Sequence, residues 1–210
     1  MYTCQKADEY IEKNRVDRAD KPEFHLTTPV GWLNDPNGFS IYGGKAHLFY
    51  QFHPYSTEWG PMHWGHSTSD DFIRWEELRT ALAPDSDYDA FGCFSGTAIE
   101  NDGKHVLFYT GVVEEKLAGG TKNVIQNQCM AVADGISYEK ISSNPVVDGK
   151  IMPEECSRAD FRDPKVWKDA DGRYYMLAGN RTYDGIPQVV LFSSDDMYNW
   201  KFESVFAKDE

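Results

Sequence analysis

A strand–turn–strand pattern that occurs three times, about 60 residues apart, strongly constrains what this chain can fold into. In each copy an apolar run leads to a glycine turn and a second apolar run returns from it. The three turns are Gly43-Gly44, Asp102-Gly103 and Asp171-Gly172. A second hairpin recurs after each of these, and its turns centre on residues 71, 135 and 196. Three copies of a four-strand unit predict an all-β fold, a β-propeller built from radial blades.

A propeller must close on itself, and propellers typically carry four to eight blades. The sequence contains three full units, and residues 201–210 resemble the approach to a fourth. We therefore expect the chain to be the N-terminal part of a longer protein.

The N-terminal segment lies outside the repeat. Residues 5–20 contain neither glycine nor proline, and Ala7, Tyr10, Ile11 and Asn14 fall on one helical stripe. This pattern predicts a short amphipathic helix. The expected organisation is an N-terminal helical extension over residues 1–23 and a propeller domain over residues 24–210.

Charge and composition exclude several classes of function. The 21 basic and 34 acidic residues give a net charge of −13, which disfavours a nucleic-acid partner because a phosphate backbone requires a basic surface. No run approaches the ~20 apolar residues of a membrane span, and the first residues lack an apolar signal core. The four cysteines lack metal-binding spacing, and His63 and His66 lack a third ligand. We expect a cytoplasmic protein with free thiols, no metal and no cofactor.

The segment Trp32-Leu33-Asn34-Asp35-Pro36-Asn37-Gly38 holds the first candidate catalytic residue. Asn-Asp-Pro is common in turns, but here Asp35 precedes a predicted strand and the layout recurs. Asp35, Ser95 and Asp163 hold equivalent positions, at the mouths of the predicted inner strands. Because such mouths converge at one end of a propeller axis, we expect the three side chains to lie together.

Two carboxylates in one funnel are the basic equipment of glycoside hydrolysis. Like charges held close together also separate the two pKa values, and so divide the roles of nucleophile and acid. Sugars bind through aromatic rings and amide groups, and such side chains crowd the same region. They include Trp32, Asn34, Gln51, Trp59 and Phe94.

These motifs resemble those of glycoside hydrolase family 32, the invertases, sucrose-6-phosphate hydrolases and fructan hydrolases. The resemblance follows one order along the chain, from about residue 24 to residue 203. It rests on Trp32 through Gly38, Gln51, Trp59, Trp64-Gly65-His66, Phe94-Ser95-Gly96 and Phe161-Arg162-Asp163-Pro164. It implies a five-bladed propeller followed by a β-sandwich, of which this chain holds about three blades and the start of a fourth.

The resemblance also implies a mechanism: Asp35 is the nucleophile, and Asp163 stabilises the transition state with Arg162 beside it. Residues implied to shape the fructose subsite are Trp32, Leu33, Asn34, Gln51, Trp59, Phe94, Ser95 and Arg162. The family's acid/base is a glutamate in a Glu-Cys motif downstream of Arg-Asp-Pro, whereas Glu155-Cys156 lies upstream. We therefore interpret Glu154 and Glu155 as surface loop charges and expect the acid beyond Glu210.

The predicted function is a retaining glycosidase that releases fructose from a small-molecule or oligosaccharide β-fructoside. One alternative is a non-catalytic sugar-binding propeller fragment, because the acid/base is missing. Another is a five-bladed glycosidase that acts on arabinofuranosides or xylosides. The sequence leaves open the choice among sucrose, sucrose 6-phosphate and fructans, and also the oligomeric state.

Overall fold

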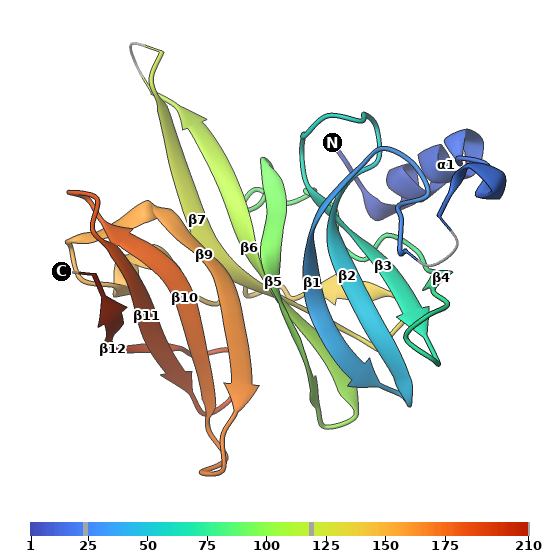
Figure 1. Ribbon diagram of the computed structural model, residues 1–210. Helices are drawn as coiled ribbons and strands as arrows, with labels where there is room; N and C mark the ends of the chain where they lie inside the picture. Colours follow the sequence, from blue (N-terminus) through green and yellow to red (C-terminus); the bar gives the residue numbers. More distant parts are fainter. Residues whose placement is uncertain (23–24, 118–119, 210) are drawn as a thin grey trace.

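The computed structural model describes residues 1–22, 25–117 and 120–209. These residues form three four-stranded antiparallel sheets and one α-helix (Figure 1). The predicted domain boundary between residues 23 and 24 lies outside the described residues. In every sheet the strands follow one another in chain order. The four-strand repeat predicted from the sequence is therefore confirmed for the part of the chain that the structure describes.

The bounds of the strands locate the repeat. The first sheet contains β1 (Trp32–Tyr42), β2 (Lys45–His53), β3 (His63–Ser69) and β4 (Glu76–Glu77). The second contains β5 (Gly92–Asn101), β6 (Lys104–Lys116), β7 (Lys122–Ala133) and β8 (Tyr138–Lys140). The third contains β9 (Cys156–Lys168), β10 (Tyr174–Thr182), β11 (Pro187–Ser194) and β12 (Lys201–Lys208).

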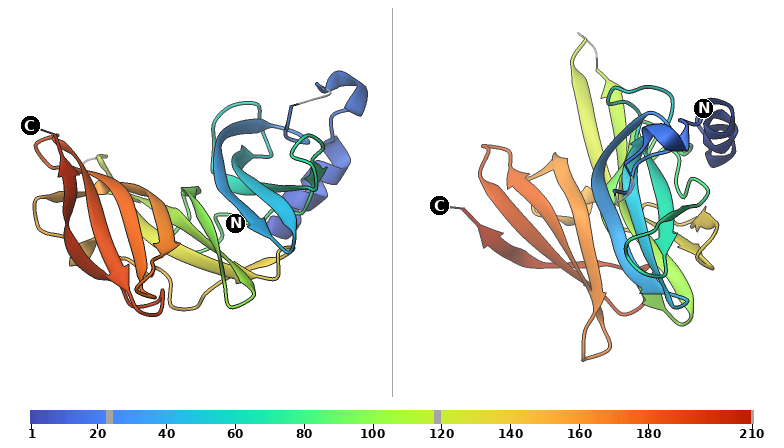
Figure 2. Two further views of the ribbon diagram at one scale, coloured as in Figure 1. Left: turned by 60° about the horizontal axis from the view of Figure 1, so that its bottom comes forward. Right: turned by 45° about the vertical axis from the view of Figure 1, so that its right-hand side comes forward.

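The three sheets stand side by side (Figure 2), and their first strands are neighbours in space. β5 contacts β1 on one side and β9 on the other. One apolar core fills the space between the first two sheets, around Phe49, Trp64 and Tyr109. A second core, around Phe108 and Phe192, joins the second and third sheets. The sheets therefore pack face to face as propeller blades do, with β1, β5 and β9 innermost.

The N-terminal helix is shorter than predicted. α1 spans Cys4–Asn14, and the hydroxyl of Thr3 caps it by accepting the Lys6 N–H. Ala7 and Ile11 are buried as the stripe predicts, whereas Asn14 is exposed. The helix ends because the backbone turns extended at Arg15. A 3₁₀ turn, η1 (Arg18–Asp20), follows, so residues 5–20 do not form one helix.

The second hairpin of the repeat has a common turn chemistry in the first and third sheets. After β3, Ser69 Oγ accepts the N–H of Phe72, and Asp71 Oδ1 accepts the next two N–H groups. After β11, Ser194 and Asp196 make the equivalent bonds. Short polar side chains thus replace the backbone partners that these turns lack.

Two further observations concern the helices and the cysteines. None of the helices in the described part of the chain is both long and apolar enough to cross a membrane. All four cysteines are free thiols.

Candidate active site

Asp35 lies inside a strand, where the sequence predicted the mouth of one. β1 already begins at Trp32, and its register against β2 shifts between Leu33 and Pro36. Three steps along β1 match two along β2, so the segment that contains Asp35 bulges out of the ladder. Pro36 has no N–H to give to that ladder, which favours the irregularity. The Asp35 side chain is exposed at this bulge.

The same irregularity recurs at the other two predicted positions. In β5 the register against β6 skips Ser95, between Phe94 and Gly96. In β9 the register against β10 shifts between Arg162 and Lys165, the stretch that contains Asp163. Each inner strand therefore has a bulge at the position that the repeat marks as equivalent. Bulges that redirect side chains are frequent beside active sites.

The bulges bring Asp35 and Ser95 into contact across two sheets. The Ser95 hydroxyl donates a hydrogen bond to Asp35 Oδ2 over 2.8 Å. Oδ1 has no hydrogen-bond partner among the described residues. A carboxylate fixed through one oxygen, with the other available, is suited to attack an electrophilic carbon.

Asp163 reaches the same place from the third sheet in a strained conformation. Its φ is +61°, in the left-handed region that residues other than glycine seldom occupy. Its backbone N–H donates to Thr110 Oγ1 of β6 over 3.1 Å. Aspartate is among the residues that tolerate this region best.

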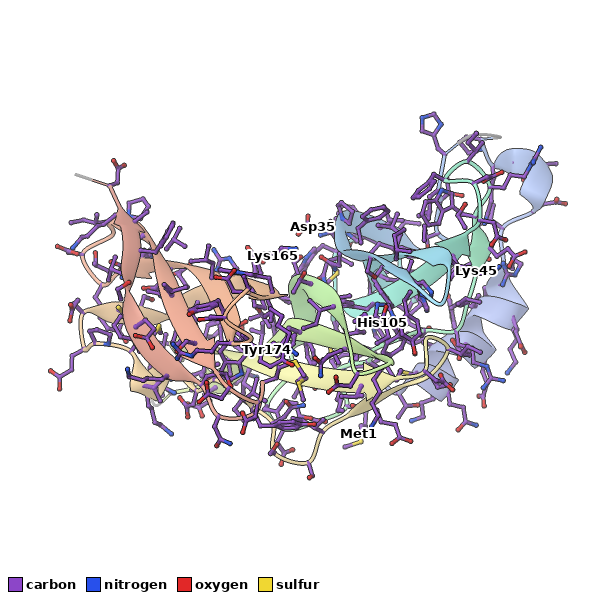
Figure 3. The ribbon with its side chains drawn as sticks, turned by 90° about the horizontal axis from the view of Figure 1, so that it is seen from below. Met1, Asp35, Lys45, His105, Lys165 and Tyr174 are labelled. Atoms are coloured by element: carbon purple, nitrogen blue, oxygen red, sulfur yellow. The ribbon has the colours of Figure 1, made fainter. Side chains whose placement is uncertain are left out.

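Asp35, Ser95 and Asp163 line one open cavity of about 280 Å³. Its other lining residues are Pro36, Asn37, Gly96, Thr97, Pro164 and Lys165. All three inner strands contribute to it. Figure 3 shows Asp35 and Lys165 at the facing edges of the first and third sheets.

The two carboxylates influence each other electrostatically. The surrounding strands desolvate the Asp163 carboxylate, although its side chain is open to the cavity, and this raises its pKa. The guanidinium of Arg162 acts in the opposite direction and lowers the pKa of Asp163, and the charge of Asp35 raises it further. Asp163 therefore holds a proton more readily than an ordinary aspartate.

Four more predicted site residues lie in β1 and β9, next to the two aspartates in sequence. Trp32 Nε1 donates to Asn34 Oδ1 over 2.7 Å, which fixes both side chains next to Asp35. Leu33, between them, packs against the small core beneath α1. The Arg162 guanidinium donates to Asp160 and to Gln126. None of these four lines the cavity described above.

The remaining three predicted residues differ in exposure. The Trp59 ring is half exposed, and its edge meets the ring of Phe94 at a centroid distance of 6.1 Å. Gln51 is buried and donates to the carbonyl of Cys93 over 2.9 Å, which ties β2 to β5. The structure therefore places Gln51 as a link between sheets and outside the cavity.

Glu154 and Glu155 are exposed in the turn that precedes β9. The carbonyl of Glu155 accepts the N–H of Tyr183. Neither residue lines the cavity.

Several residues of the site were not singled out from the sequence. Asn37, Thr97 and Lys165 line the cavity, and the Asn37 amide is buried without a hydrogen-bond partner. Thr110 is buried beneath Asp163. A usable signal for it was a threonine directly after the apolar run 106–109.

Two larger cavities lie elsewhere in the described chain. One, of about 550 Å³, lies between the N-terminal segment and the first sheet, and its Glu77 is paired with Arg15 and Lys21. Another, of about 750 Å³, lies at the outer strands of the second sheet. Neither draws on more than one of the inner strands, so size alone does not identify the site. The described residues contain no cluster of three or more groups that could hold a metal ion.

Comparisons with known proteins give a matching family model and several similar proteins. The model of the glycosyl hydrolases family 32 N-terminal domain matches residues 25–210. A sucrose-6-phosphate hydrolase of Escherichia coli is 42% identical over 187 residues, which cover 89% of this chain and 38% of that protein. A raffinose invertase of Escherichia coli is 41% identical over 96% of this chain and 41% of its own length.

A solved structure shares the fold. The structure of a β-fructofuranosidase of this family from Bombyx mori superposes with a TM-score of 0.86 at 40% identity, covering 98% of this chain and 42% of that one. A variant of that protein was solved in complex with sucrose. The present chain therefore spans about two fifths of the length of these relatives.

Proposed function

Because the chain belongs to glycosyl hydrolase family 32, we propose that its protein is a retaining glycosidase that releases fructose from β-fructosides. The observation that carries the proposal is the meeting of Asp35, Ser95 and Asp163 in one cavity built from three inner strands. The relatives named above are fructoside-cleaving enzymes, which supports the same reaction.

Asp35 is the nucleophile of this proposal. Ser95 holds Oδ2, so Oδ1 attacks the anomeric carbon of the fructosyl unit as the bond to the leaving oxygen breaks. The product is a fructosyl ester of Asp35. Water then attacks the same carbon from the opposite face, which frees fructose and regenerates the carboxylate with net retention.

Asp163 stabilises the transition state of both steps. Positive charge develops on the fructosyl ring, and a second carboxylate in the same partly desolvated cavity opposes it. Arg162 favours the ionised form of this carboxylate, because its charge opposes the rise in the pKa of Asp163. Trp59 and Phe94 offer an aromatic corner to the sugar, and Trp32 and Asn34 offer a fixed hydrogen-bonding pair.

The proton for the leaving oxygen comes from a third group. The described lining residues include two carboxylates, and both already have roles. In our proposal a glutamate on a further blade of a five-bladed propeller supplies this proton and, left as a carboxylate, takes up a proton from the attacking water in the second step. General acid catalysis of this kind is typically worth ~10²–10⁴-fold in rate.

Sucrose and sucrose 6-phosphate are the proposed substrates, because the relatives named above include a sucrose-6-phosphate hydrolase and the fructofuranosidase whose variant holds sucrose. We place the protein in the cytoplasm, and its four free thiols fit a reducing compartment.

The test is an Asp35→Ala substitution in the full-length protein, assayed by fructose release from both substrates. We expect loss of activity, with retained activity in the exposed control Asp87→Ala. Activity that survives in Asp35→Ala would refute the assignment of the nucleophile. Calorimetric binding of fructose by a wild-type protein that turns over neither substrate would favour a sugar-binding module instead.

A further inference from the structure

Asp163 occupies a conformation that its own strand does not support. The φ of +61° is unfavourable for a residue with a side chain, and the ladder between β9 and β10 is interrupted at this point. Strained backbone of this kind persists only where surrounding groups hold it in place. The structure around Asp163 therefore has to supply that support.

The support comes from the neighbouring sheet. Thr110 Oγ1 in β6 accepts the Asp163 N–H over 3.1 Å. The hydroxyl has one proton, which it donates to Gln128 Oε1 in β7 over 2.9 Å, and the Ser95 carbonyl is a more distant alternative at 3.5 Å. Thr110 and Gln128 are direct cross-strand partners, and both are fully buried.

Gln128 makes a second hydrogen bond between the second sheet and β9. Its Nε2 donates to the carbonyl of Phe161 over 2.8 Å, two residues before Asp163. The buried Thr110–Gln128 pair of the second sheet is thus hydrogen-bonded to β9 on both sides of Arg162, at Phe161 and at Asp163. Its neighbour Gln126 accepts the Phe161 N–H over 2.9 Å on the same stretch.

Thr110 also lies between two residues of the site, Ser95 of the second sheet and Asp163 of the third. Its hydroxyl faces the backbone of Ser95, whose side chain binds Asp35, and the backbone of Asp163. Thr110 and Gln128 are themselves fully buried, so removing the Thr110 hydroxyl leaves its hydrogen-bonding partners unsatisfied.

We propose that the Thr110–Gln128 pair is the positioning element of the site: it holds Asp163 in the left-handed conformation that aims its carboxylate at the cavity it shares with Asp35. Neither residue touches the substrate. The pair acts only through Asp163, and its effect on catalysis rests on the function proposed above.

The key variant is Thr110→Val, which keeps the shape of the side chain and removes the hydroxyl. The Asp163 N–H then loses its acceptor, and the backbone relaxes out of the strained region. A displacement near 1 Å of a transition-state group costs up to ~10²-fold. We expect kcat on sucrose to fall about tenfold to a hundredfold, with a smaller change in KM, because the displaced Asp163 acts in the transition state.

Two further variants separate positioning from simple destabilisation. Thr110→Ser restores the hydroxyl and should recover most of kcat. Thr182→Val removes a buried hydroxyl of the third sheet that also accepts a backbone N–H, from Ile186 over 3.0 Å, and donates to Asp184. It should lower the melting temperature comparably and leave kcat unchanged.

Crystal structures of the full-length protein and these variants give a readout that does not require activity. We expect the Asp163 carboxylate to move in Thr110→Val alone. An unmoved Asp163, or an unchanged kcat in an active enzyme, would overturn the inference. If the wild-type protein releases no fructose, the proposed function fails, and the position of Asp163 in Thr110→Val still decides whether the pair holds it.

Discussion

Ser95 and Asp35 are hydrogen-bonded across the gap between the first two sheets, although 60 positions separate them in sequence. The hydroxyl of Ser95 lies 2.8 Å from Asp35 Oδ2. Both residues sit in bulges of inner strands, so the bond connects two irregular points of otherwise regular ladders. The contact holds the carboxylate through Oδ2 and leaves Oδ1 without a hydrogen-bond partner among the described residues.

Substitution of Ser95 by alanine should therefore weaken catalysis. A hydrogen bond to a charged group contributes about 1.5–3 kcal/mol, which corresponds to a loss of roughly ten- to a hundredfold in kcat/KM. Steady-state fructose release measures it. The exposed serine control Ser142→Ala should retain wild-type activity. Equal activity of Ser95→Ala and wild type would show that Asp35 needs no orientation by this hydroxyl.

Asp163→Asn should stabilise the fold at neutral pH while it lowers activity. The raised pKa means that the folded state binds the Asp163 proton more tightly than the unfolded state does. The stability of the wild type therefore falls as pH rises from the ordinary aspartate range through the raised pKa. Asparagine tolerates the same backbone and removes the charge. The melting temperature of Asp163→Asn at pH 7 should exceed that of the wild type, and a lower value would contradict this account.

Arg162→Gln should move the acidic limb of the activity profile to higher pH. Arg162 lowers the pKa of Asp163, so its loss lets that pKa rise and leaves the carboxylate protonated over a wider acidic range. The measurement is kcat/KM against pH. Arg79→Gln, at an exposed position, should leave the limb in place. A shift towards lower pH would mean that another group controls the limb.

The histidines buried between the first two sheets should make the fold sensitive to acid. His47 Nδ1 lies 2.9 Å from His66 Nε2, and burial lowers the pKa of His105 to about 4. A histidine with a lowered folded pKa favours folding above its unfolded value, near 6.5, and this stability is lost as pH falls through the window to about 4.

For His105 the loss at pH 4 is on the order of 3 kcal/mol. Melting temperatures from pH 7 to pH 4 measure it. His105→Gln cannot titrate, so its stability should depend less steeply on pH. If the melting temperatures of the variant and the wild type fall equally with pH, His105 is not the source of the acid sensitivity.

Lys140 should be a strong stabilising contact between the second sheet and the segment 83–92. Its ammonium group donates to Asp85 and to the fully buried Asp89, each over 2.6 Å. Lys140→Met leaves the Asp89 carboxylate without its cation and should cost about 3–5 kcal/mol in unfolding free energy. Lys122→Met, which breaks a pair between the exposed Lys122 side chain and the partly buried Glu114, should cost less than about 1 kcal/mol. Urea denaturation of both variants compares them, and similar losses would show that burial of Asp89 adds nothing.

The repeated strands and hairpins were predictable because short stretches of sequence specify them. Glycine turns and alternating apolar runs specify strands and hairpins through contacts a few residues apart, and three copies imply three similar sheets. The motif around Asp35 was visible for the same reason. The length of α1 was overestimated, because nothing in the composition of residues 15–20 marks the extended backbone at Arg15.

The chain alone determined which residues recur at equivalent places, namely Asp35, Ser95 and Asp163. Only the tertiary structure decided how they act together. The bulges, the left-handed backbone of Asp163 and its support by Thr110 and Gln128 depend on register between strands and on packing between sheets. Such contacts join residues far apart in sequence, so no local pattern encodes them.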